Sequence, residues 1–298
     1  MMGLLGLGRM GLGMARRWSG AGLPVLGYDP DPAARARAAN GGVPVADSLA
    51  ELLSRLPPPR NLWLMVPANG VEEALEALKP QLAPGDLVVD GGNSPYWQSQ
   101  RRGHELAALG VGFLDVGVSG GLFGEEEGYG LMVGGERALV ERILPYLQAL
   151  APEGGFVHAG TLGAGHYAKM VHNGIEYALM EAYAEGIELL AAAQEELDLD
   201  PQAVVGAWRR GTIVRSFLLD RFAEVLAGDL AVEPLVADSG EGRWAVEEAL
   251  RRGLPVPALA QALFARWESQ GKASLRYRLL ALVRRAFGGH PVRRQDAD

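Results

Sequence analysis

A glycine-rich turn near the amino terminus restricts what the first part of this chain can fold into. Its sequence is Gly6-Leu7-Gly8-Arg9-Met10-Gly11, a G-x-G-x-x-G pattern. The turn follows a short apolar run at residues 3–6 and opens a helical pattern at residues 11–21. Glycines in this arrangement permit a tight strand-to-helix turn and let backbone N–H groups approach a pyrophosphate at the helix amino terminus. The turn therefore predicts a βαβ unit that binds a dinucleotide.

The second part of this fingerprint is an acidic residue at the end of the next strand. Asp29 follows the apolar run at residues 25–28, at the expected distance of about 20 residues from the turn. A carboxylate there accepts hydrogen bonds from the ribose 2′ and 3′ hydroxyls and repels a 2′-phosphate. The sequence therefore favours NAD, while Arg35 and Arg37 nearby leave NADP possible. A purely turn-forming role for Asp29 is the alternative.

Strand and helix patterns alternate up to about residue 160, as in βαβ units. Further strands are predicted at residues 62–66, 87–90 and 112–115, with a possible pair at 130–134 and 155–158, and helices at 32–40 and 71–78. In a doubly wound sheet the carboxyl ends of the strands line the cofactor crevice. We therefore expect Val66 and Pro67, at the end of the third strand, to pack on the cofactor. A simple strand-to-helix turn is the alternative there.

The second half of the chain has helical patterns only. Residues 165–196 contain no proline and little glycine, which predicts one long helix. Shorter helices are predicted at residues 201–210, 216–226, 243–252, 257–269 and 274–287. We therefore predict an α/β Rossmann domain over residues 1–162 and an all-α domain over residues 163–298.

The composition narrows the class of protein. The 298 residues include no cysteine, which excludes disulfides and thiolate metal sites, and no ligand cluster suggests a metal. The net charge of −8 argues against nucleic-acid binding, because an acidic surface repels phosphate backbones. No apolar run is long enough to span a bilayer, and the amino terminus lacks the pattern of a signal peptide. We expect a cytoplasmic protein without membrane or nucleic-acid partners.

The predicted long helix carries an unusual lysine. Among 28 basic residues the only lysines are Lys79, Lys169 and Lys272. A lysine can give up its proton where an arginine cannot. On a helix, Lys169, Asn173 and Glu176 share one face, because they are spaced i, i+4 and i+7. His172 borders this face. An ordinary solvated stripe is the alternative, but the flanking residues are apolar or small.

This stretch resembles the signature of the 6-phosphogluconate dehydrogenases, within the wider β-hydroxyacid dehydrogenase family. Lys169 and Asn173 match a Lys-x-x-x-Asn pattern of the wider family, whereas His172, Glu176 and Tyr177 resemble the narrower group. Further matches are Asp90-Gly91-Gly92-Asn93-Ser94, Val118-Ser119-Gly120-Gly121, Arg266, and a carboxyl-terminal end with Arg284 and His290.

The resemblance implies roles for these residues. Asn93 lies beside the nicotinamide and the substrate, and Ser119, Gly120 and Gly121 bind the substrate, as does Tyr177. Arg266 binds the substrate phosphate. Arg284 and His290 reach the neighbouring subunit's active site, which implies a homodimer or a higher homo-oligomer; a solvated basic helix face is the alternative. The chain resembles the short form of the family, and Ser239 stands at the nearest local match to the long form's phosphate-contacting lysine.

The reaction implied is the oxidative decarboxylation of 6-phosphogluconate to ribulose 5-phosphate and CO2 with reduction of NAD or NADP, as in the pentose phosphate pathway and gluconate utilisation. The residues suit this chemistry. Lys169 would take the hydroxyl proton and then polarise the ketone oxygen, and Glu176 would protonate carbon 1. His172 and Asn173 would orient the substrate. The alternatives are a dehydrogenase of the 3-hydroxyisobutyrate or tartronate semialdehyde type and, more remotely, a non-catalytic NAD-binding regulator.

Overall fold

The structure is a computed structural model that describes residues 1–271, 275–280 and 283 of the chain. The chain divides into two compact units, Met1–His172 and Asn173–Asp298. This division by contacts falls within a long helix, whereas the predicted boundary between residues 162 and 163 lies just ahead of that helix. The division by contacts gives the first turns of this helix to the first unit, whereas the predicted boundary gives them to the second. The predicted domain limits stay a prediction.

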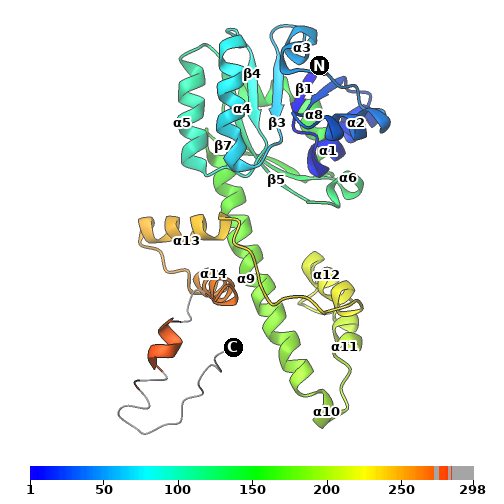
Figure 1. Cartoon of the computed structure of the whole chain (residues 1–298), viewed down its shortest axis with the longest axis vertical. Coiled ribbons are helices and arrows are strands. Elements are labelled where there is room, and N and C mark those ends of the chain that lie inside the picture. The colour runs from blue at the N-terminus through cyan, green and yellow to red at the C-terminus, as the bar shows by residue number, and fades with distance from the viewer. Residues whose placement is uncertain (272–274, 281–282, 284–298) are drawn as a thin grey trace, which may run out of the picture. The chain divides into compact units, whose positions relative to one another are not determined.

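The first unit is built on a seven-stranded sheet with the order β2-β1-β3-β4-β5-β6-β7 (Figure 1). The strands are β1 Met2–Leu5, β2 Val25–Tyr28, β3 Asn61–Leu64, β4 Leu87–Asp90, β5 Gly112–Ser119, β6 Gly130–Gly134 and β7 Phe156–Gly160. Neighbouring strands are parallel except for β5 and β6, which pair antiparallel. Each predicted strand is present. β5 is longer than the predicted 112–115, because its second half pairs with β6.

Helices cover both faces of this sheet. They are α1 Arg9–Gly20, α2 Pro32–Asn40, α3 Leu49–Arg55, α4 Val71–Leu78, α5 Tyr96–Ala107, α6 Gly124–Glu127, α7 Arg137–Arg142 and α8 Leu144–Leu150, with 3-10 turns at Ala68–Gly70 and Lys79–Gln81. Alternate strand residues supply two cores. Trp63 packs with Trp18 of α1 on one face, and Leu64 packs with Leu75 of α4 on the other. The α/β Rossmann prediction is confirmed.

The second unit is helical in the part that the structure describes. Its helices are α9 Ala164–Ala192, which begins in the first unit, α10 Gln194–Leu197, α11 Pro201–Trp208, α12 Phe217–Leu226, α13 Glu241–Arg252 and α14 Pro257–Ser269. α11 packs against α12, and α13 against α14. α9 ends before residue 196, the predicted limit. Of the predicted helix at 274–287, residues 275–280 and 283 are described, and they are helical; the other positions lie outside the described residues. None of the helices described is both long and apolar enough to cross a bilayer.

Candidate active site

The glycine-rich turn joins β1 to α1 by a backbone path that only glycine can follow. Gly6 has a φ of +98°, and a Cβ atom there would overlap the carbonyl oxygen of Met65. A Cβ atom on Gly11 would overlap the carbonyl oxygen of Gly6. By contrast, a Cβ atom on Gly8 would meet no atom within 4 Å. No side chain caps the amino terminus of α1, which leaves its first N–H groups for a ligand such as a pyrophosphate.

Asp29 is bonded directly to the glycine-rich turn. Its Oδ2 atom accepts a hydrogen bond from the Leu7 N–H at 2.7 Å, and its Oδ1 atom accepts one from the Asp31 N–H at 2.9 Å. The second bond is the local turn that the alternative interpretation expected, while the first joins Asp29 to the glycine-rich turn. Each carboxylate oxygen has a second lone pair, which can accept a hydrogen bond from a ribose hydroxyl.

The predicted cofactor segments meet at one edge of the sheet. β1 lies between β2 and β3, so the chain order reverses between β1 and β3, and the crevice opens at their carboxyl ends. Gly6 follows β1 there, and Val66 and Pro67 follow β3. A Cβ atom on Gly92 would lie 2.6 Å from the Val66 carbonyl oxygen, so the loop that carries Asn93 passes beside Val66. These residues fit a nicotinamide dinucleotide.

Lys169, His172 and Ser119 form a cluster within the first unit. The Nζ atom of Lys169 is 3.5 Å from Nδ1 of His172, and Nε2 of His172 is 3.4 Å from Oγ of Ser119. The Lys169 side chain is 7% exposed. An imidazole can accept a hydrogen bond at one ring nitrogen and donate one at the other, so the His172 ring can link the Lys169 amine to the Ser119 hydroxyl.

Strand β5 sets the place of Lys169. Asp115, which is fully buried, accepts hydrogen bonds from the N–H groups of Gly163 at 2.6 Å and His166 at 2.8 Å. It therefore caps the amino terminus of α9 from outside the helix. A Cβ atom on Gly117 would overlap the Cβ of Lys169, so the lysine stem rests directly on the strand backbone. Asp115 was not predicted from the sequence, where its only local signal is that an acidic residue closes a predicted strand.

Tyr129 connects the Ser119-Gly120-Gly121 turn to the cofactor helix. Its hydroxyl donates to the Met10 carbonyl oxygen at 3.4 Å and lies where a Cβ atom on Gly13 would have to go, and its ring lies where a Cβ atom on Gly124 would have to go. Burial, together with the nearby charge of Glu125, raises the pKa of Tyr129 to about 12. The phenol therefore stays a hydrogen-bond donor. Sequence reasoning also missed this residue.

The remaining predicted residues of α9 belong to the second unit. Asn173 is 7% exposed, and Glu176 is partly buried three residues further along. Both fall on the helix face of Lys169, because α9 is continuous through these positions.

Tyr177, Arg266 and Ser239 come together in the second unit. The Tyr177 hydroxyl lies 3.0 Å from the Ser239 hydroxyl, and the Arg266 guanidinium stacks on the Tyr177 ring at 3.6 Å. Burial and the charge of Glu185 raise the pKa of Glu181, one turn beyond Tyr177, while the positive charge of Arg266 opposes the shift. Tyr177 and Arg266, two predicted substrate residues, thus lie together with Ser239. Ser239 is the nearest local match to the phosphate-contacting lysine of the long form. Arg284 and His290 lie outside the described residues.

Comparison with protein families assigns both parts of the chain. Residues 1–163 match the NAD binding domain of 6-phosphogluconate dehydrogenase, and residues 165–285 match the 6-phosphogluconate dehydrogenase C-terminal domain. The chain is 43% identical over 302 aligned residues to the NAD(+)-dependent, decarboxylating 6-phosphogluconate dehydrogenase of Haloferax volcanii. That alignment covers 99% of each chain.

Solved structures agree with this comparison. The 6-phosphogluconate dehydrogenase of Plasmodium falciparum, solved apo, with its cofactor NADP+ and with its substrate 6-phosphogluconate, superposes with a TM-score of 0.82 at 27% identity. The match covers 100% of this chain and 67% of that one, so the present chain is the shorter. The 3-hydroxyisobutyrate dehydrogenase of Salmonella typhimurium superposes with a TM-score of 0.77 at 26% identity, covering 91% of this chain and 94% of that one.

Proposed function

Because the chain belongs to the 6-phosphogluconate dehydrogenase family, we propose that it converts 6-phosphogluconate to ribulose 5-phosphate and CO2 with reduction of NAD. The observation that carries this proposal is the cluster of Lys169, His172 and Ser119. It combines a buried amine, an imidazole and a hydroxyl at one edge of a dinucleotide-binding unit. An alcohol oxidation needs such a base beside its substrate.

The bound nicotinamide would supply the hydride acceptor, and the protein supplies the proton transfers. Neutral Lys169 takes the proton of the substrate 3-hydroxyl as that carbon is oxidised to a ketone. The resulting ammonium then donates to the ketone oxygen and stabilises the negative charge that develops there as the carboxylate leaves as CO2. As Glu176 donates a proton to carbon 1 of the enediol that remains, Lys169 takes back the proton of the enol hydroxyl, which gives ribulose 5-phosphate. Asn93, Asn173 and the Ser119-Gly120-Gly121 turn hold the substrate hydroxyls and carboxylate.

Tyr177, Ser239 and Arg266 form the phosphate end of the site in this proposal. A guanidinium binds phosphate through two parallel hydrogen bonds, and its stacking on the Tyr177 ring holds it in one plane. The Ser239 hydroxyl adds a neutral donor where the long form has a lysine. Arg284 and His290 are assigned to the same phosphate from a second subunit.

The contacts around Asp29 support NAD over NADP. The carboxylate at the end of β2 would meet a 2′-phosphate with like charge. Both arginines that left NADP possible have other partners: Arg35 donates to the Asp29 carbonyl oxygen at 2.7 Å, and Arg37 is 3.8 Å from the Asp31 carboxylate. The Haloferax volcanii relative is named as NAD(+)-dependent, whereas NADP+ is the cofactor in the Plasmodium falciparum structure.

A homodimer in the cytoplasm is the remaining part of the proposal. Val171, Ile175 and Leu179 repeat every four residues along α9 and are 38%, 49% and 43% exposed. An apolar helix stripe of this kind is covered in many oligomers by a second copy. Light scattering of the purified chain should give twice the monomer mass of 31.7 kDa.

The test of the proposed reaction is an assay of the purified full chain with 6-phosphogluconate, using NAD and NADP in one preparation. We expect reduced cofactor and CO2 in equal amounts, with the higher kcat/KM for NAD. The same assay with 3-hydroxyisobutyrate tests the second candidate, which the Salmonella typhimurium match favours. Turnover of 3-hydroxyisobutyrate alone, or of neither substrate, would refute the proposal.

A further inference from the structure

The loop that carries Asn93 is tied down on both sides of that residue. Asp90, at the end of β4, is fully buried. Its Oδ1 atom accepts a hydrogen bond from the Gly92 N–H at 3.1 Å, and its Oδ2 atom accepts one from the Ser94 hydroxyl at 2.8 Å. The two chain neighbours of Asn93 are therefore bound to a single carboxylate.

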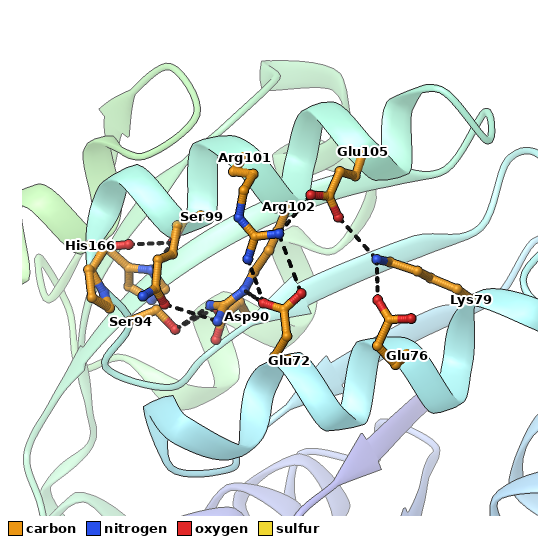
Figure 2. A network of polar contacts seen from close by, with 12 residues as sticks. Glu72, Glu76, Lys79, Asp90, Ser94, Ser99, Arg101, Arg102, Glu105 and His166 are labelled. Atoms are coloured by element: carbon orange, nitrogen blue, oxygen red, sulfur yellow. Dashed lines mark hydrogen bonds and ion pairs between the residues drawn. The ribbon is translucent and has the colours of Figure 1, made fainter.

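Arg102 of α5 holds this carboxylate and this loop in place (Figure 2). Its guanidinium is 2% exposed, and its Nη1 atom donates to Oδ2 of Asp90 at 3.3 Å and to Oγ of Ser94 at 2.9 Å. Nη2 donates to Oε1 of Gln98 at 3.1 Å, and Nε donates to Oε2 of Glu72 at 3.2 Å. One planar group thus connects α4, the end of β4, the loop and α5.

Only an arginine makes this connection. A guanidinium offers five N–H donors in a fixed plane, whereas an ammonium offers three on a flexible stem and cannot reach four partners in one plane. A buried ion pair adds little net stability, because desolvation of the two charges offsets their attraction. Such a pair can instead fix one geometry, and the geometry fixed here is that of the loop beside the cofactor crevice.

We propose that Arg102 is a positioning residue for Asn93: through Asp90 and Ser94 it holds the loop in the conformation that presents Asn93 to the substrate and nicotinamide. The inference rests on the proposed function, since Asn93 acts only if the chain turns over a substrate beside a nicotinamide ring. Displacement of a positioning group by about 1 Å can lower a rate by about 100-fold.

Arg101 provides a matched control for Arg102. The two arginines are adjacent in α5 and both contact Glu72, but the Arg101 side chain is 50% exposed and pairs with Glu72 at 2.6 Å and Glu105 at 2.7 Å. Figure 2 shows Arg101 directed towards these two carboxylates. We expect Arg102→Lys to lower kcat by about 10- to 100-fold and Arg101→Lys to change it by less than about twofold. The NADH dissociation constant should change by less than about twofold in both variants.

A double-mutant cycle with Asn93→Ala separates positioning from a general structural role. If Arg102 acts through Asn93, Arg102→Lys lowers kcat in the wild-type background and has almost no further effect in the Asn93→Ala background. Ser94→Ala, which removes one hydroxyl, should behave in the same way with a smaller loss. It serves as the test if circular dichroism shows that Arg102→Lys does not fold.

The outcomes distinguish this inference from the proposed function. A wild-type chain that is inactive with 6-phosphogluconate refutes both. An active wild type whose Arg102→Lys variant matches Arg101→Lys refutes the positioning role alone. Equal losses in the wild-type and Asn93→Ala backgrounds also refute it, because Arg102 would then act by another route.

Discussion

The amino-terminal turns of α9 and the turns that follow hold their functional side chains by different means. In the first unit the stem of Lys169 rests on the backbone of β5 at Gly117, and buried Asp115 caps the helix. In the second unit Tyr177 and Arg266 are held by a ring stacking contact and a hydroxyl contact between side chains. A contact with strand backbone yields less readily than a contact between two side chains, so a change beside Lys169 displaces that residue, whereas a change at Tyr177 or Arg266 mainly weakens a contact. We therefore expect changes in the first region to lower kcat and changes in the second to raise KM.

The largest effect should follow loss of the proposed base. Lys169→Met keeps the length and apolar stem of the side chain but removes the amine that we propose exchanges a proton with the substrate. We expect kcat to fall by about 10³- to 10⁴-fold, with NADH binding by fluorescence unchanged. Substantial remaining turnover would show that the base lies elsewhere.

Glu176 tests the limit of the comparison, because it is a proposed proton donor, and therefore expected to affect kcat, although it lies in the second unit. Glu176→Gln keeps the shape and removes the proton donor, so turnover should slow by about 10²- to 10⁴-fold. The substrate KM should change little. Near-normal rates with a raised KM would make Glu176 a substrate contact and would remove the exception.

Two glycines of β5 allow the contact between the strand backbone and Lys169 to be tested with a matched control. In Gly117→Ala the new methyl group collides with the Cβ of Lys169 and pushes the base away, so kcat should fall by about 10- to 100-fold. In Gly112→Ala it meets the flexible end of Leu139 at 2.8 Å, which can move. Equal kcat values for the two variants would contradict the idea that β5 sets the position of Lys169.

The phosphate end should respond through affinity. Arg266→Lys keeps the charge but loses the planar donor pair and the stacking on Tyr177, so KM for 6-phosphogluconate should rise by about 10- to 100-fold with little change in kcat. Tyr177→Phe keeps the ring and removes only the hydroxyl near Ser239, so its effect on KM should be smaller. A fall in kcat at constant KM in Arg266→Lys would contradict the expectation that changes in the second region act through substrate affinity.

The smallest expected effect concerns acid stability. Hydrogen bonds from Arg101, followed by Arg102, hold the pKa of Glu72 below its ordinary value of 4.5, although burial opposes this shift. A lowered pKa contributes stability above about pH 4.5, which is lost as the pH falls through the pKa of the folded state. Glu72 is 41% exposed, so the contribution should not exceed about 1 kcal/mol. Thermal unfolding of wild type and Glu72→Gln should differ near pH 7 and converge in acid.

Local patterns were enough to locate the strands, three helices of the first unit (α1, α2 and α4) and the longer helices of the second unit, whereas α3, α5, α7 and α8 were not predicted. Short apolar runs bounded by glycine and proline predicted each strand, and the proline-free stretch after residue 164 predicted α9. The order of the strands and the extension of β5 to Ser119 did not follow from sequence, because both depend on pairing between segments distant in the chain. Nothing in the alanine- and glutamate-rich sequence near residue 193 marks the break between α9 and α10.

The candidate site was predictable where residues lie close in sequence and not where they meet across the fold. Lys169, Asn173 and Glu176 could be placed on one face because a helix has a fixed period. Asp115 was missed, since its partner Gly163 is 48 positions away. Arg102 was missed for the same reason: its contacts with Asp90 and Glu72 exist only once β4, α4 and α5 have packed.

The continuity of α9 from residue 164 to 192 has a consequence for how chains of this kind can vary in length. Lys169 and Glu176 are separated by about 10 Å along the helix axis, at about 1.5 Å per residue. One inserted residue between them would turn the carboxyl group by about 100° around the axis and off the lysine face. Homologous chains should therefore gain and lose residues in the first part of the connection between α12 and α13, well ahead of Ser239, where no helical period fixes the positions, and keep the number between these two side chains constant.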